Sequence, residues 1–123
     1  MILDDLVGKH QLSGVDFGQD GDANTILFCL DGKVFCATED PDDGYRSSMA
    51  EIKIVQAEIS NRFDPVDVMG TMRANEEYGN DVIDFHVIEN SQLVLSVGTE
   101  ASDDYYPNFC TYWAPENLPG NKT

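Results

Sequence analysis

The sequence has few basic residues. Seven Lys and Arg stand against 23 Asp and Glu, which gives a formal net charge of −16 at pH 7. A surface of this sign repels phosphate backbones and anionic lipids, so we expect no direct binding to nucleic acid or to membranes. The charge favours partners with basic protein surfaces or divalent cations, although acidity can also serve solubility alone.

Long apolar runs and cysteine pairs are also missing. No stretch reaches the roughly 18–20 apolar residues of a membrane-spanning helix, and the first residues lack the features of a signal peptide. The three cysteines, Cys29, Cys36 and Cys110, are odd in number and have no zinc-binding spacing. We therefore expect reduced core thiols, no metal, no cofactor, and a cytoplasmic location, in a host cell if the protein is phage-encoded.

Catalytic motifs are absent. His10 and His86 are the only histidines, and no nucleophile elbow, phosphate-binding glycine loop or zinc-protease motif occurs. His86 lies between apolar residues of an expected strand, where a structural role is favoured over general-base catalysis. Enzymatic activity stays open, but the sequence favours a protein without it.

The clearest pattern is a β-hairpin formed by 26–30 and 33–38, joined by Asp31-Gly32. Asp-Gly between two β-rich runs favours a two-residue type I′ turn, which fixes the register of the strands. The expected pairs are Leu30 with Lys33, Cys29 with Val34, Phe28 with Phe35, Leu27 with Cys36, and Ile26 with Ala37. Both faces are apolar, which predicts a position in the middle of the fold or under an oligomer interface.

Other short segments have strand or turn patterns. Strands are expected at 12–17, 66–72, 82–88, 93–97 and 108–113, strand or helix at 51–57, and turns or polar loops at 18–24, 39–48 and 63–65. This order predicts a mainly β protein, with α+β as the alternative: an antiparallel meander of about six to eight strands, sandwich or half-barrel like, with at most one or two short helices. Residues 1–123 form a single domain, with 114–123 as a loose tail.

Two acidic segments are the candidate partner-binding sites. The first has four carboxylates in five residues, which repel one another unless solvent, a cation or a basic partner neutralises them. The second places two tyrosines beside two aspartates, as in a contact surface or a cap over the core. The candidate residues are Glu39, Asp40, Asp42, Asp43, Tyr45, Arg46, Asp103, Asp104, Tyr105 and Tyr106. The calcium-binding EF-hand pattern fails at both attempts to align it, so a solvated loop is the main alternative to a partner site.

Three short motifs resemble a family of uncharacterised small phage and prophage proteins. They are Leu6-Val7-Gly8-Lys9, the acidic stretch 38–47, and the stretch 98–107 with its paired tyrosines. In place of the adjacent cysteines that are common in the family, this chain has Asp42-Asp43, so no thiol or metal chemistry is carried over. The resemblance implies origin in a mobile element and a β-rich fold.

Three functions follow as hypotheses. The first is a small acidic interaction module, such as a phage inhibitor that binds a basic surface of a nucleic-acid-handling or defence protein by imitating the charge density of DNA. The second is an accessory phage protein that forms a homo-oligomer through the apolar hairpin face. The third is a small-molecule or calcium binder. We expect them in this order.

Overall fold

The computed structural model describes residues 3–43, 46–73, 81–101 and 107–119, and at 42, 43, 46 and 101 the backbone alone. These residues form one antiparallel sheet in the order β4-β3-β2-β1-β5-β6-β7-β8. The strands are β1 (Gly8–Asp20), β2 (Ala23–Leu30), β3 (Lys33–Asp43), β4 (Arg46–Val55), β5 (Arg62–Met72), β6 (Asp81–Val87), β7 (Leu93–Ala101) and β8 (Pro107–Trp113). Two 3₁₀ helices, η1 (Leu3–Leu6) and η2 (Pro115–Asn117), complete the described elements. The mainly β fold expected from the sequence is confirmed.

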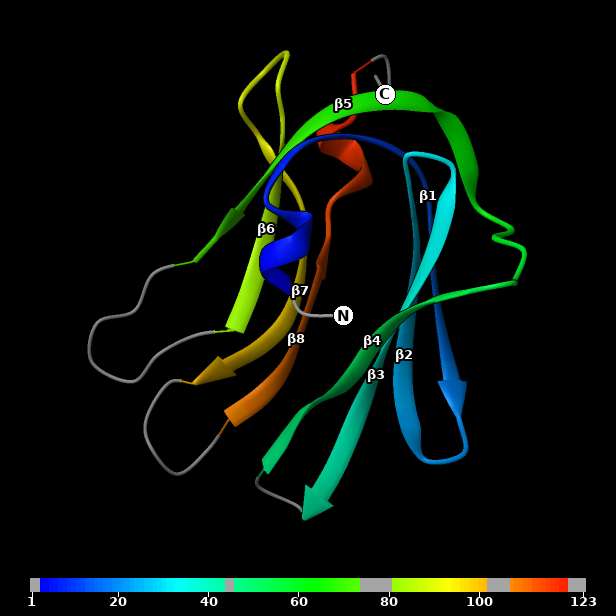
Figure 1. The fold of residues 1–123 in the computed structure, drawn as a ribbon, viewed down its shortest axis with the longest axis vertical. Coiled ribbons are helices and arrows are strands. Elements are labelled where there is room, and N and C mark those ends of the chain that lie inside the picture. Colours follow the sequence, from blue (N-terminus) through cyan, green and yellow to red (C-terminus); the bar gives the residue numbers. More distant parts are fainter. Residues whose placement is uncertain (1–2, 44–45, 74–80, 102–106, 120–123) are drawn as a thin grey trace.

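The sheet curls until its two edge strands approach each other (Figure 1). The backbone N–H of Phe109 in β8 donates to Ser47 Oγ in β4 at 3.2 Å. The N–H of Met49 in β4 donates to Thr99 Oγ1 in β7 at 3.0 Å. Side chains therefore bridge β4 to the opposite half of the sheet where no strand ladder does.

The concave face of the curled sheet encloses the hydrophobic core. Phe28 stacks on Phe35 with ring centroids 5.5 Å apart, and Phe85 packs against Phe28 from the other half of the sheet. Leu3 and Leu6 of η1 are buried in the same cluster. Each such side chain contributes about 1.5–3 kcal/mol when fully buried, so one shared core holds the two halves together.

The β2–β3 hairpin has the register expected from its turn. Leu30 pairs with Lys33 and Phe28 with Phe35. Asp31 has φ 54° and Gly32 has φ 80°, and two consecutive positive φ angles are what a type I′ turn requires.

Three expected turns or loops are strands instead. Residues 18–20 and 23–24 extend β1 and β2, which leaves a tight turn in place of the polar turn 18–24. The loop prediction for 39–48 is wrong as well, because β3 continues to Asp43 and β4 starts at Arg46. The turn expected at 63–65 lies inside β5. Acidic residues and proline are tolerated here because irregularities in the ladder lie beside them, between Pro41 and Asp43 and between Leu12 and Gly14.

The described part of the expected tail packs against the sheet. Ala114 is buried, and its backbone N–H donates to the carbonyl of Val94. Asn117 Nδ2 donates to the carbonyl of Leu93 at 2.7 Å, and Leu118 packs against the core. Residues 114–119 are therefore held in place, and the rest of the segment lies outside the described residues.

Candidate functional site

One end of the sheet collects a large share of the negative charge. We call the four stretches 20–24, 39–46, 73–81 and 99–108 the acidic end, because they lie at or join strand ends on the same side of the sheet (Figure 1). They hold twelve of the 23 acidic residues and two of the seven basic ones. The sequence therefore concentrates acidic residues in the stretches that end or join these strands.

Described contacts connect the strand ends that carry these stretches. Thr99 in β7 pairs with Asp81 in β6 and with Phe109 in β8. The Ser47–Phe109 hydrogen bond joins β8 to β4, and β4 pairs with β3. Because β4 approaches β8, the two candidate segments begin at neighbouring strand ends although about 60 residues separate them in the chain.

The structure describes only part of the predicted site. Glu39 and Asp40 lie in β3, and the backbones of Asp42, Asp43 and Arg46 belong to the β3–β4 hairpin. The predicted residues that lie outside the described part of the chain are Tyr45, Asp103, Asp104, Tyr105 and Tyr106.

Glu39 is tied to the neighbouring strand. Its Oε1 accepts hydrogen bonds at 3.1 Å from both the backbone N–H and the side-chain amide of Asn24. This carboxylate therefore fixes the end of β3 against the start of β2. Asp40 is paired through its backbone with Ser48, and in the part of the chain that the structure describes its carboxylate has no hydrogen bond or ion pair.

A polar network on the convex face includes two residues of the acidic end, Arg73 and Glu100. Arg73 contacts Asp84 in a two-pronged arrangement, with Nη2 to Oδ1 at 2.9 Å and Nε to Oδ2 at 3.2 Å. Ser96 Oγ donates to Asp84 Oδ1 at 2.6 Å, and Glu100 forms an ion pair with Arg73. The hydrogen bonds that Arg73 donates to Asp84, together with the negative charge of Asp84, outweigh desolvation and hold the pKa of the Arg73 guanidinium above its ordinary value. This arginine is thus neutralised inside the protein and offers little positive charge to a ligand.

The thiol beside this network is not set up as a nucleophile. Burial is the main reason that the pKa of Cys110 lies above its ordinary value, and Arg73 acts in the opposite direction. A raised pKa keeps the thiol protonated, whereas nucleophilic catalysis needs the thiolate. Cys29, Cys36 and Cys110 are all free thiols, as expected.

His10 joins the N-terminal helix to the hairpin turn. Its Nδ1 lies 2.6 Å from Asp31 Oδ2 and its Nε2 lies 2.9 Å from the carbonyl oxygen of Leu6. Burial of Asp31 acts to raise its pKa, but the hydrogen bonds from His10 and from the N–H of Gln11 outweigh it, so the pKa is lowered. Because both ring nitrogens of His10 make contacts within the protein, these contacts give His10 a structural role.

No group of three or more His, Cys, Asp or Glu that could hold a metal ion occurs among the described residues. Within the same residues, no helix is long and apolar enough to span a membrane.

The apolar outer face of the central hairpin is covered in part by the chain itself. Ile59, in the connection between β4 and β5, is buried with Cys29 and Val34. Asp16 positions this connection, because its two carboxylate oxygens accept the N–H groups of Ser60 at 2.6 Å and Asn61 at 3.0 Å. The apolar pattern of this face therefore has an explanation within one chain, and the homo-oligomer stays a prediction that this face does not support.

No protein family, curated protein or solved structure matches the chain. The resemblance to phage and prophage proteins accordingly stays a hypothesis. A proposal of function therefore rests on the geometry of the described residues.

The sequence did not indicate two of the arrangements described above. Arg73 follows the end of β5, Asp84 lies in β6 and Ser96 in β7, and no local motif connects them. The contribution of Asp20 and Asp22 to the acidic end was also missed, because their segment was interpreted as an isolated turn. Alternation in 82–88, which places Asp84 and His86 on the face opposite Phe85, is the signal that could have indicated a polar outer face.

Proposed function

We propose that this protein is an interaction module whose acidic end binds a basic protein surface. The observation that carries the proposal is that neighbouring strand ends are followed or joined by four stretches whose sequence holds twelve acidic and only two basic residues. Carboxylates without a basic partner, such as that of Asp40 among the described residues, attract a basic partner over the range of the Debye length, about 8 Å at physiological salt. Complementary charge on a partner raises the rate of association and the specificity of the complex.

The partner that fits best is a protein that itself binds nucleic acid. Duplex DNA carries one negative charge per about 1.7 Å of its axis, and its binding proteins present matching basic channels. An inhibitor encoded by a phage or another mobile element would occupy such a channel in a nuclease or a defence protein. The phage-like motifs motivate this origin.

The test compares two triple variants with the same change in charge. One carries Asp40→Asn, Asp42→Asn and Asp43→Asn in the acidic end; the other carries Asp5→Asn, Glu58→Gln and Glu116→Gln elsewhere. The measurement is the Kd for an oligo-lysine peptide and for a basic nuclease, from 50 to 300 mM salt. We expect at least tenfold weaker binding for the first variant, little change for the second, and a steep loss of affinity with salt in the unmodified protein.

Two results would contradict the proposal. Equal weakening in the two variants would mean that the net charge alone attracts the probes. Binding that does not respond to salt would mean that the carboxylates are not the contact.

A further inference from the structure

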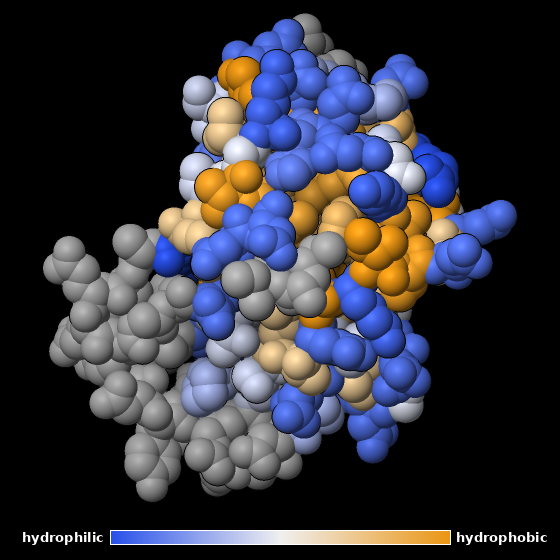
Figure 2. Space-filling model, viewed as in Figure 1, coloured by the Kyte–Doolittle hydropathy of each residue, from blue (hydrophilic) through white to orange (hydrophobic). Residues whose placement is uncertain are grey.

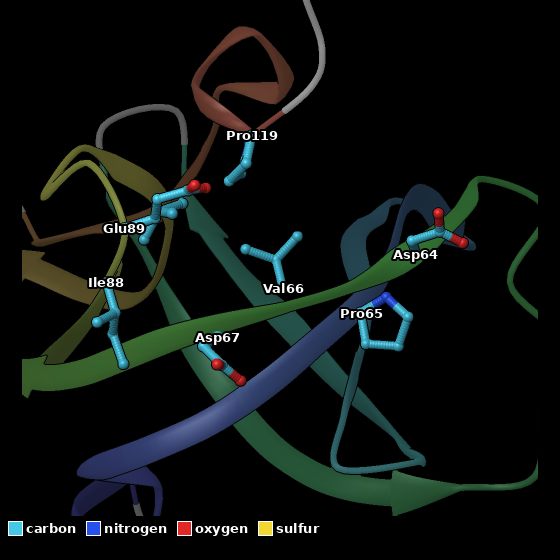
Figure 3. A pocket seen from close by; sticks show the side chains of 8 residues that line it. Asp64, Pro65, Val66, Asp67, Ile88, Glu89 and Pro119 are labelled. Carbon is cyan, nitrogen blue, oxygen red and sulfur yellow. The ribbon is translucent and has the colours of Figure 1, made fainter.

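Two adjoining pockets lie at the end of the molecule away from the acidic end. One has a volume of about 380 Å³ and lies between β5 and the β6–β7 turn. The other, of about 390 Å³, lies between β5 and the segment that follows β8. They share Asp64, Val66 and Pro119, so they form one groove. Figure 3 shows Val66 of the first pocket projecting from β5 toward Pro119, with Glu89 beside it.

The groove is built into the fold. Leu12 pairs with Val66 and Gly14 with Arg62, so that residues 63–65 of β5 face the single residue Ser13 of β1. This bulge pushes the segment out of the ladder and makes one wall.

The opposite wall is held by asparagine side chains. Asn90 Nδ2 donates to the carbonyl of Asn117 at 3.0 Å, and Asn117 Nδ2 donates to the carbonyl of Leu93. These bonds place Pro115, Leu118 and Pro119 across from β5. A ligand would therefore meet a largely formed site, which lowers the ordering cost of binding.

The lining combines an aromatic surface with negative charge. Phe63 and Trp113 stack with centroids 5.7 Å apart at 20°. Asp64, Asp67 and Glu89 line the groove, and none of the described residues that line it is basic. Gln11 donates to Asp67, whereas no hydrogen bond or ion pair joins Asp64 or Glu89 to another residue of the described part.

We propose that this groove binds a small organic dication, an alkyl diammonium with a short apolar chain. One ammonium group would lie near Asp64 and the aromatic pair, the other would lie near Glu89, and the alkyl chain between them would lie on Val66 and Pro119, which line both pockets. Aromatic faces attract cations by about 0.5–2 kcal/mol, and pockets of several hundred Å³ suit small ligands. This proposal does not depend on the proposed function of the acidic end.

Trp113 is the single tryptophan of the chain, so its fluorescence reports directly on the groove. The probes are 1,5-diaminopentane and, as the uncharged analogue, 1,5-pentanediol. We expect a saturable change of emission with the diamine and none with the diol. Asp64→Asn combined with Glu89→Gln should weaken diamine binding at least tenfold. The control, Asp20→Asn with Asp22→Asn, removes the same charge at the acidic end and should leave binding unchanged.

Three outcomes would overturn the inference: no saturable signal, an equal response to the diol, or equal weakening in the two double variants. The last would indicate diffuse attraction to an acidic protein. Circular dichroism of each variant shows that it is folded. The Asp40, Asp42 and Asp43 variant should keep the fluorescence response, so this proposal and the proposed function fail separately.

Discussion

The outer faces of the two halves of the sheet differ in polarity. On the half that contains β2 and β3, the outer face of this hairpin is apolar, and Ile59 covers part of it in a small second cluster. On the half formed by β5, β6, β7 and β8, the outer face carries the network of Arg73, Asp84 and Ser96. Both halves place large apolar side chains on the shared inner core.

The difference shows how a curled sheet limits its exposed apolar surface. Apolar side chains on an outer face need a cover, and the long β4–β5 connection supplies one (Figure 1). Where no connection crosses the sheet, polar side chains satisfy each other. Figure 2 shows hydrophilic residues over most of the visible face, with hydrophobic residues gathered in its middle.

The largest expected effect comes from removing the cover. Ile59→Ala should lower the free energy of unfolding by about 2–4 kcal/mol, because a buried isoleucine leaves a cavity, and urea denaturation measures it. It should also expose Cys29, which is 2% exposed, so this thiol should react faster with a maleimide, as mass spectrometry shows. The control is Ile54→Ala, at a residue that is 47% exposed. It should lower the free energy of unfolding by less than half as much. Similar losses in the two variants would refute the covering role of Ile59.

A smaller effect is expected from the polar face. Arg73→Met removes the partner of a carboxylate that is only 14% exposed. We expect the free energy of unfolding to fall by about 2 kcal/mol. This is less than for a fully buried ion pair, because solvent reaches the arginine. Combining Arg73→Met with Asp84→Leu should restore part of the stability in urea denaturation, since no unpaired charge remains. A double variant less stable than Arg73→Met alone would mean that the network is not a self-contained pair.

The smallest effect concerns the contact of His10 with Asp31, which joins η1 to the β2–β3 turn. Because the pKa of Asp31 is lowered in the folded state, its carboxylate stabilises the protein above the unfolded pKa of about 3.9. This contribution is lost as the pH falls through the folded value. Asp31→Asn should therefore cost about 1 kcal/mol at pH 7, a small value because the carboxyl is half exposed.

Thermal melting from pH 7 to pH 2.5 checks this prediction. The difference in Tm between the unmodified protein and Asp31→Asn should begin to shrink below about pH 4, where the unfolded chain takes up the proton, and should be smallest below the lowered folded pKa, where Asp31 is protonated in both states. A constant difference over this range would show that the charge of Asp31 does not contribute.

Local patterns were sufficient for the hairpins. The Asp31-Gly32 turn and the β-rich runs beside it predicted each of the five pairs named for β2 and β3. β6 and β8 were also predicted close to their bounds, whereas β7 continues four residues beyond the predicted 93–97. Residues 39–43 and 63–65 were missed because acidic residues and proline disfavour strands locally, whereas neighbouring strands and bulges supply the pairing here.

The candidate site was predicted only in part. The acidic segments were found from composition, but their meeting at one end depends on the approach of β4 to β8. The groove lined by Phe63 and Trp113 could not be predicted, because 50 residues separate the two stacked rings in the chain and a bulge in β5 shapes the wall beside them. Contacts of this kind depend on side chains from distant strands, and no local propensity encodes them.

By itself, the sequence determined the charge of the protein, its β-rich character and the register of its central hairpin. These properties follow from composition and from interactions between residues close in the chain. Only the tertiary structure decided which outer face is covered, which carboxylates meet, and where the groove lies. The reason is that curling of the sheet brings strands from both halves together, and the position of each edge depends on every strand between them.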